Sequence, residues 1–463
     1  MHRFLRFINK TEAVCTLWIA LCFSLTSAVY LSWTYHLMLF AEPEYVDIYC
    51  LVLGYAFQAA GIAISIYLFK NYPVLASRKA FIICVLIYSL VTLPALMGNS
   101  LIGILIFGFL MNLVCGGITG FYLYGTATHL KQNTRGKAFG FGYAISVVLI
   151  FLLSLMKRGR FLHTQEAYIF YLLLAAAVIA AAIRLFNSAP THSPTKDDQS
   201  SMSVSLTLLT LAFITVVLLS LVKNMGFNFP SSDIAAGTNL ELSRLFYAVG
   251  LIIAGFVSDR NRKYGAACTV TALVLPFVML ALANETLPAM ICWGLDYLFY
   301  GFFSVFRAIL FMDLAEQSGK YHLAVCGLLF GRIGDALGTI LYRIFSFNRL
   351  WLVCIALILF ALTVFLFIRL YQHLYIPNVT QEKSEREVFE SFAIQHDLSA
   401  REKEVLRLVL LEQSIPQIAE TLFVTESTVR YHVHNLLQKS GCKSRQELVK
   451  NYNTKLYPGI SKQ

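Results

Sequence analysis

Long apolar runs separated by short polar segments fill the chain as far as residue 371. Each has the length that a membrane-spanning helix needs, about 20 mostly apolar residues for roughly 30 Å of hydrocarbon. The pattern therefore predicts twelve transmembrane helices, near residues 14–40, 46–69, 80–97, 101–124, 138–156, 167–186, 204–222, 239–257, 265–283, 287–312, 322–342 and 350–371.

One polar interruption is much longer than the others. The segment NSAPTHSPTKDDQSSMS at 187–203 contains two prolines, many Ser and Thr residues and no apolar periodicity. It predicts a linker between two six-helix halves, 14–186 and 204–371. Beyond residue 371 the long runs stop, and residues 372–396 carry four glutamates at helical spacing, which predicts a solvated connecting helix.

Short amphipathic segments follow from Ser399 and predict four small helices. Residues that favour helix starts and ends mark them: Ser399 with Glu402, Pro416, Thr425, Gly441, and Ser444 with Glu447. Two short helices joined by a tight turn, the second polar and basic on its outer face, are typical of proteins that read the DNA major groove. We therefore expect an all-α protein with a membrane domain at 1–371, a connector at 372–396 and a DNA-binding domain at 397–463.

Composition supports this division. The 463 residues are 57% hydrophobic and 14% charged, against roughly 25% charged in soluble domains, which excludes a water-soluble chain. Residues 1–371 hold 25 Lys and Arg against 15 Asp and Glu, whereas residues 372–463 hold 12 against 11, an ordinary soluble composition. Nine of the ten cysteines lie in the apolar part, where they are most simply small buried hydrophobes.

The basic residues of the short loops predict the orientation, because such loops stay in the cytoplasm. The N-terminus and the second, fourth and eighth loops are basic, whereas the first loop is acidic. One loop, with Lys157, Arg158 and Arg160, departs from the pattern. We expect a multi-pass membrane protein with no cleaved signal peptide and with both termini in the cytoplasm.

Three motifs in the tail carry a specific resemblance: R-E-x-E-V-L at 401–406, I-A-x-x-L at 418–422 and T-V-x-x-H at 428–432. Residues 398–449 resemble the LuxR-type helix-turn-helix of bacterial transcription regulators. Glu412, Ser440 and Cys442 depart from that family's usual Gly, Leu and Val. The resemblance implies binding to double-stranded promoter DNA and dimerisation through the fourth helix, near 444–452.

The family's base-reading positions fall on Arg430, Tyr431 and His434, which share one helix face. Thr428, Lys439 and Lys443 are the phosphate contacts that we expect. The alternative is that this surface is only a solvated basic helix face. From residue 416 onward there are seven Lys and Arg against three Asp and Glu, so a single module attracts DNA weakly and a dimer helps.

The membrane part resembles the major facilitator superfamily in its two six-helix halves and in one loop. The segment GFVSDRNRK at 255–263 is similar to that family's G-x-L-x-D-R-x-G-R-R loop, whereas the matching first-half segment, LFKNYPVLASRK, lacks the acidic residue. In such transporters this loop gates the movement of the halves. Because the first-half copy of this motif is incomplete, the sequence argues against efficient transport.

Four charges lie inside apolar runs, where each costs about 2.5–3.5 kcal/mol unless it is paired or hydrated. They are Asp296 and Arg307 in the tenth run and Arg332 and Asp335 in the eleventh. One interpretation is a cavity between the halves that binds a small polar or charged ligand, and the other is a structural ion-pair network. Four glycines at 327, 331, 334 and 338 form a smooth face suited to close helix packing.

No Walker loop, dinucleotide fingerprint or metal-binding spacing occurs in the sequence, so we expect no enzyme, no metal and no cofactor. The sequence favours a membrane-bound one-component transcription regulator that senses a small molecule. Two alternatives remain: a working proton-coupled antiporter that also regulates, and a tail that binds protein rather than DNA.

Overall fold

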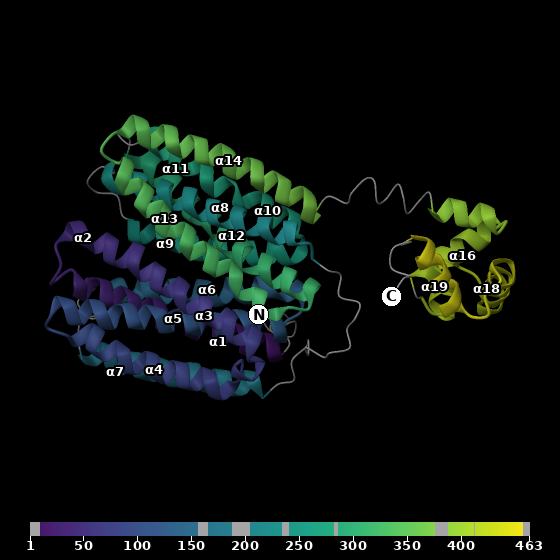
Figure 1. Cartoon of the computed structure of the whole chain (residues 1–463), viewed down its shortest axis with the longest axis horizontal. Coiled ribbons are helices and arrows are strands. Elements are labelled where there is room, and N and C mark those ends of the chain that lie inside the picture. Colours follow the sequence, from purple (N-terminus) through teal and green to yellow (C-terminus); the bar gives the residue numbers. More distant parts are fainter. Residues whose placement is uncertain are drawn as a thin grey trace. The chain divides into compact units, whose positions relative to one another are not determined.

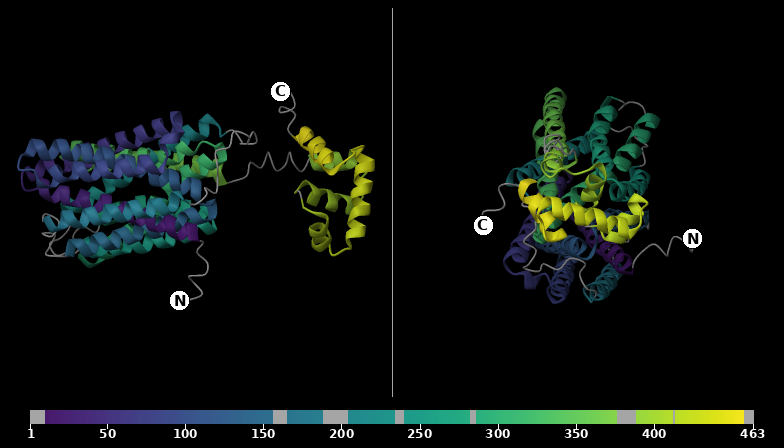
Figure 2. Two further views of the ribbon diagram at one scale, coloured as in Figure 1. Left: turned by 90° about the horizontal axis from the view of Figure 1, so that it is seen from below. Right: turned by 90° about the vertical axis from the view of Figure 1, so that its right-hand side faces the viewer.

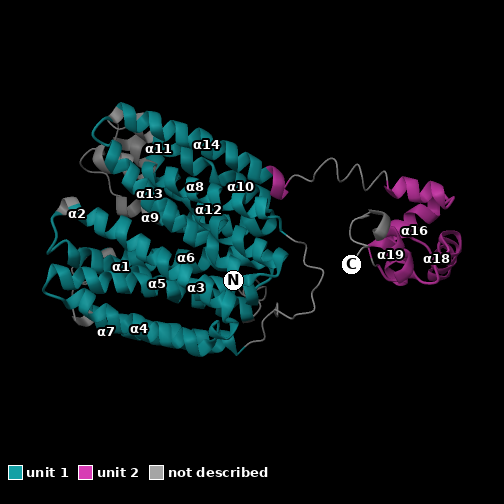
Figure 3. Ribbon diagram, in the orientation of Figure 1, with its two compact units in different colours: residues 1–371 teal, residues 372–463 magenta. Residues whose placement is uncertain are grey.

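The computed structural model describes residues 10–155, 165–187, 204–233, 240–281, 286–375, 388–411 and 413–456. Residues 188–203 of the predicted linker at 187–203 and the basic residues 157, 158 and 160 lie outside these ranges. The chain divides into two compact units, residues 1–371 and 372–463, which Figure 3 colours separately. We describe each by itself.

Long helices that run side by side build the first unit, the membrane unit (Figures 1 and 2). The first half contains α1 Lys10–Leu37, α2 Pro43–Asp47, the π-helix η2 Ile48–Gly54, α3 Tyr55–Asn71, η3 Pro73–Leu75, α4 Arg78–Met97, α5 Leu101–His129, α6 Gln132–Leu155 and α7 Gln165–Phe186. The second half contains α8 Leu206–Asp233, α9 Leu240–Arg260, α10 Arg262–Thr269, α11 Thr271–Ala281, α12 Thr286–Ser318, η5 Tyr321–Val325, α13 Cys326–Phe345 and α14 Arg349–Tyr375.

Ten helices in the described ranges are long and apolar enough to cross a membrane. The chain is therefore a multi-pass membrane protein, and helices account for its apolar runs. The predicted eighth span coincides with α9, and the predicted ninth is divided between α10 and α11. These two are not among the ten, so the total of twelve stays a prediction.

The two halves meet where α6 of the first half packs against α9 of the second. A Cβ added to Gly140 would lie 2.3 Å from the carbonyl oxygen of Leu251, and one added to Gly255 would lie 2.6 Å from that of Gly136. Because those separations are far below van der Waals contact, the two backbones can approach this closely only where the side chain is a hydrogen atom.

The glycines of α13 act in packing, as their spacing predicts. A Cβ at Gly334 would lie 2.3 Å from the carbonyl oxygen of Val217 on α8, and one at Gly327 would lie 1.9 Å from the carbonyl oxygen of Arg307 on α12. The stripe thus brings α13 against two neighbours at once.

The second unit consists of a helix at 388–395, followed by α16 Ala400–Leu410, α17 Ile415–Leu422, α18 Glu426–Ser440 and α19 Arg445–Leu456. The predicted capping box is present, because Ser399 accepts a hydrogen bond from the Glu402 N–H and Glu402 accepts one from the Ser399 N–H. At α19 the expected second box is incomplete. Ser444 accepts from the Glu447 N–H, but the Glu447 carboxylate accepts from the Lys443 N–H, one residue earlier.

The helix at 388–395 is part of the core of the second unit. Phe392 is 1% exposed and packs edge-on against Tyr452 of α19 at 5.4 Å, while the guanidinium of Arg407 lies 4.8 Å from the ring of Phe389. Lys403 on α16 forms an ion pair with Glu390 at 2.8 Å. The end of the expected connector therefore packs with the helix-turn-helix rather than forming a fully solvated spacer.

Glu402 is almost completely buried and also binds Lys439, whose Nζ lies 2.8 Å from its Oε2. Burial raises the pKa of the Glu402 carboxyl, but the hydrogen bonds from Lys439 and Ser399 outweigh burial, so the pKa lies below its usual range. The charged carboxylate thus joins the start of α16 to the end of α18.

We expect Gly334→Ala to destabilise the membrane unit by about 1–3 kcal/mol, because the new methyl group forces α13 away from α8. Gly103→Ala is the matched control, since the nearest side-chain atom to its Cβ lies 4.0 Å away. Thermal unfolding of the two purified variants measures the effect, and equal unfolding temperatures would show that the contact at Gly334 is not tight.

We expect Glu402→Gln to lower the free energy of unfolding of a 372–463 fragment by about 1–3 kcal/mol at neutral pH. Because the folded-state pKa is depressed, this stabilisation is present above the unfolded pKa, about 4.3, and disappears as pH falls through the folded value. Chemical unfolding followed by circular dichroism from pH 7 to pH 3 measures both effects. Glu404→Gln, in an exposed pair with Arg401, should change stability by less than about 0.5 kcal/mol, and a pH-independent effect of Glu402→Gln would contradict the explanation.

Candidate functional site

A tight turn joins α17 to α18 and presents α18 to solvent. Phe423 ends α17 in the left-handed conformation, with φ 54° and ψ 44°, and its side chain is 95% exposed. Thr425 then caps α18 by accepting a hydrogen bond from the Thr428 N–H, and Gly441, with φ 70°, ends that helix. These local signals give α18 the ends that the sequence predicts.

The inner face of α18 holds the small domain together, and its outer face is open. Val429, Val433 and Leu436 are buried in the core. Arg430, Tyr431 and His434 are exposed on the opposite side, Tyr431 by 63%. The Arg430 guanidinium lies 3.2 Å from the Glu426 carboxylate, one turn earlier. The structure thus groups the three residues expected to read bases.

The three expected phosphate contacts differ in their surroundings. Thr428 is half-buried and its hydroxyl lies 2.9 Å from that of Thr425, whereas the side chain of Lys443 is exposed. Lys439 donates to the Asp397 carbonyl oxygen and to Glu402, each at 2.8 Å. Two of its three ammonium protons therefore have partners inside the domain, a structural role that the sequence did not indicate.

A second group of charged residues lies inside the membrane unit. Arg307 on α12 and Arg332 on α13 approach the same oxygen of Asp335, at 3.5 and 3.6 Å. Their guanidinium groups also lie over aromatic rings, 5.0 Å from Phe303 and 4.4 Å from Tyr55. Three of the four charged residues singled out in the sequence therefore meet.

Asp296, the fourth, is fully buried and neither carboxylate oxygen has a hydrogen-bond partner. It lies on the same helix as Arg307, but the ion pair of Arg307 is with Asp335 on α13. The charge of Asp296 interacts with Lys223 of α8, a buried residue whose ammonium lies 3.3 Å from the ring centre of Tyr300. Sequence reasoning missed Lys223 because it follows the expected end of the seventh run by one residue.

Aromatic side chains from both halves surround this charged group. Tyr143 of the first half contacts Tyr247 of the second at 5.4 Å between ring centres, and Tyr247 stacks on Tyr300 at 4.8 Å. Tyr55, the first residue after the π-helix η2, belongs to the first half and contacts Arg332 of the second. Through Arg332 and these tyrosines, the charged group of the second half borders the first half.

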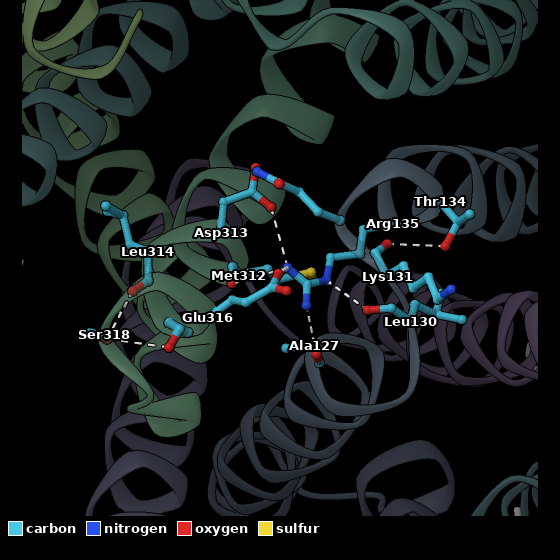
Figure 4. A network of polar contacts seen from close by, with 12 residues as sticks. Ala127, Leu130, Lys131, Thr134, Arg135, Met312, Asp313, Leu314, Glu316 and Ser318 are labelled. Atoms are coloured by element: carbon cyan, nitrogen blue, oxygen red, sulfur yellow. Dashed lines mark hydrogen bonds and ion pairs between the residues drawn. The ribbon is translucent and has the colours of Figure 1, made fainter. Parts of the chain in front are cut away.

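Arg135, at the start of α6, forms a different kind of network with the second half (Figure 4). Its side chain is fully buried. The guanidinium donates to the carboxylates of Glu316 at 2.6 Å and Asp313 at 3.3 Å on α12, and to the carbonyl oxygens of Ala127, Leu130 and Met312. The protein thus supplies an acceptor to each of its three guanidinium nitrogens.

The end of α9 and the start of α10 complete this connection between the halves. Asp259 accepts hydrogen bonds from the N–H groups of Gly136 and Lys137, each at 2.8 Å, and so ties the end of α9 to the second turn of α6. Arg262 donates to Asp259, to Asp313 and to the Gln132 carbonyl oxygen. We call this network of Arg135, Asp259, Arg262, Asp313 and Glu316 the interlock.

Part of the interlock was visible in the sequence. The residues 255–263 stood out by their motif, but Asp313 and Glu316 did not, because they lie at the polar end of a long apolar run. A carboxylate pair three residues apart on one helix face was the available signal. In the described residues no cluster of His, Cys, Asp and Glu has an arrangement that could hold a metal ion.

The membrane unit is similar in structure to the human organic anion transporter MFSD10 (TETRAN). The match covers 79% of this chain and 98% of the transporter, with a TM-score of 0.51 and 15% sequence identity. At this identity the likeness shows the fold alone: a helical membrane bundle of the major facilitator type, as the sequence led us to expect.

The tail matches the family described as bacterial regulatory proteins, luxR family, over residues 396–451. It is 42% identical over 52 residues to the spore germination protein GerE of Bacillus subtilis, which is 11% of this chain and 70% of GerE. It is 52% identical over 48 residues to the probable transcriptional regulatory protein NarL of Mycobacterium tuberculosis, 10% of this chain and 22% of NarL. By its C-terminal helix-turn-helix, the chain belongs to the luxR family of bacterial regulatory proteins.

Proposed function

We propose that the protein is a membrane-bound one-component transcription regulator, in which the membrane unit senses a small molecule and the tail binds promoter DNA. The observation that carries the proposal is the combination in one chain of a luxR-family helix-turn-helix and a transporter-like bundle with charges buried between its halves. We place the protein in the bacterial inner membrane with both termini in the cytoplasm, where the tail can reach DNA.

Base reading in this proposal depends on the exposed face of α18. The guanidinium of Arg430 suits guanine O6 and N7 or a phosphate, while Tyr431 and His434 offer single hydrogen bonds or apolar contact. Thr428 and Lys443 contact phosphates. Lys439 uses its remaining ammonium proton for this purpose, since two are donated inside the domain.

Signal transfer uses the segment between α14 and the helix-turn-helix. Support comes from the helix at 388–395, whose Phe389 and Phe392 pack against Tyr452 of α19. In this proposal a dimer forms through α19, so a change in the 388–395 helix alters the surface next to the dimer contact. A nearly complete switch requires the ligand to favour one state by about 5.5 kcal/mol.

A second candidate function is transport of the ligand by proton-coupled antiport in the region of Asp296 and Arg307. The interlock favours it, because an ion pair and hydrogen bonds that join the halves at one end of the bundle suit a gate that opens and closes. Uptake into vesicles with and without a proton gradient separates the two, since a sensor binds its ligand without net flux.

We expect Arg430→Ala to weaken promoter binding by about 10- to 100-fold, the loss of one bidentate base contact. Arg401→Ala is the matched control, because it also removes an exposed arginine paired with a glutamate on its own helix, at 2.6 Å. Both variants lose the same net charge, so nonspecific attraction to DNA falls equally. Gel-shift titrations of the full chain in nanodiscs measure the affinities.

Unchanged promoter binding by Arg430→Ala, with the protein still inserted in the membrane, would remove α18 from base reading. If no promoter fragment shifts even with the unmodified chain, the tail is instead a protein-binding module.

A further inference from the structure

One group of buried charges in the described part of the membrane unit does not balance. In the described part of this unit, this group contains Lys223, Asp296, Arg307, Arg332 and Asp335, and Arg332 borders the first half. Lys223 interacts with Asp296, whereas Arg307 and Arg332 share the one carboxylate of Asp335, so the fully ionised set of these three residues carries one excess positive charge. Because an uncompensated charge in a protein interior is strongly unfavourable, a ligand with one negative charge restores the balance.

The two arginines have donors to offer such a ligand. Both approach a single oxygen of Asp335, at 3.5 and 3.6 Å, distances longer than the 2.7–2.9 Å or so of a strong charge-assisted hydrogen bond. A guanidinium has five N–H donors. Arg135 shows the contrast, because its donors reach five oxygens of the protein, the nearest at 2.6 Å.

Arg332 is also reachable, with 25% of its side-chain surface exposed, compared with none of that of Arg135. Gly331, next to it on α13, leaves space for the neighbouring arginine. A Cβ at residue 331 would lie 2.7 Å from Nη1 of Arg307. The local backbone therefore keeps both guanidinium groups near the shared carboxylate.

Aromatic rings of the protein lie beside the two arginines and indicate what else a ligand bound there would contact. Tyr55 lies 4.4 Å from the guanidinium of Arg332 and is paired with Tyr30, and Phe303 lies 5.0 Å from that of Arg307. Ring faces favour flat apolar groups, which gain both buried area and offset stacking. The two arginines thus suit an anionic group of a ligand, and the rings beside them suit an aromatic ring attached to that group.

We propose that the membrane unit binds a small aromatic monocarboxylate, with its carboxylate between Arg307 and Arg332 and its ring against Tyr55. This inference rests on the sensing role proposed above and gives the sensed molecule a chemical class. A cationic ligand would add to the charge imbalance, and a neutral one would leave it.

The experiment uses the full chain in nanodiscs and three acids: benzoate, phenylacetate and indole-3-acetate. Each is compared at about 10 mM with its primary amide, and benzylamine serves as the cationic probe. We expect at least one acid to raise the unfolding temperature by about 2–4 °C, and neither its amide nor benzylamine to do so.

Variants test the position of the carboxylate. Arg332→Gln should weaken binding of the acid by about 10- to 100-fold, Arg332→Lys should keep part of it, and Arg184→Gln, an exposed arginine of α7, should keep all of it. The unfolding temperature without ligand shows that each variant is folded.

Four results would overturn the assignment: no stabilisation by any of the acids, equal stabilisation by acid and amide, stabilisation by benzylamine, or an undiminished effect in Arg332→Gln. Promoter binding measured on the same samples separates this inference from the proposed function. Acid binding without promoter binding would contradict the proposed role in transcription and support the ligand class. Promoter binding without acid binding would contradict the ligand class and support the role in transcription.

Discussion

Charged groups inside a membrane need ion-pair or hydrogen-bond partners within the protein, and the membrane unit is arranged around this requirement. At the interlock, the guanidinium of Arg135 in the first half donates to oxygens of both halves, and Asp259 of the second half accepts two backbone hydrogen bonds from a helix of the first. These contacts join the halves at the end of the bundle where α6 begins and α9 and α12 end. Deeper between the halves, two arginines share one carboxylate, so the same requirement is met incompletely there.

The two units reach their stability by different means. In the membrane unit, where the surrounding lipid removes most of the hydrophobic driving force between helices, glycines allow backbones to touch and packing supplies the contact energy. In the tail, a small apolar core is supplemented by helix caps and by the buried Glu402 carboxylate. The aromatic residues at 389 and 392 enlarge that core beyond the part that resembles the luxR family.

Local chemistry in the sequence predicted local structure well. The capping box at Ser399, the cap at Thr425 and the stop at Gly441 depend on neighbouring residues, and the structure confirms each. Apolar runs likewise predicted helices, because the length of a run is a local property. The exposed face of α18 followed from helical spacing, although its role in DNA binding stays a prediction.

Contacts between residues that are far apart in the sequence could not be predicted from such local patterns. Asp296 and Arg307 lie in one apolar run and on one helix, yet the partner of Arg307 is Asp335 on another helix. Lys439 looked like a free basic residue, because nothing in its neighbourhood reveals that Glu402, 37 positions earlier, is buried beside it. Helical periodicity identifies the face of a residue but not the helix that this face meets.

Gly331 illustrates a consequence of such distant contacts for evolution. Its missing side chain provides the space in which the guanidinium of Arg307 lies, although the two residues are 24 positions apart and on different helices. Any larger residue at 331 displaces that guanidinium, and a shorter residue at 307 leaves a hole beside the glycine. Substitutions at these two positions should therefore be epistatic, and related proteins should vary them together rather than independently.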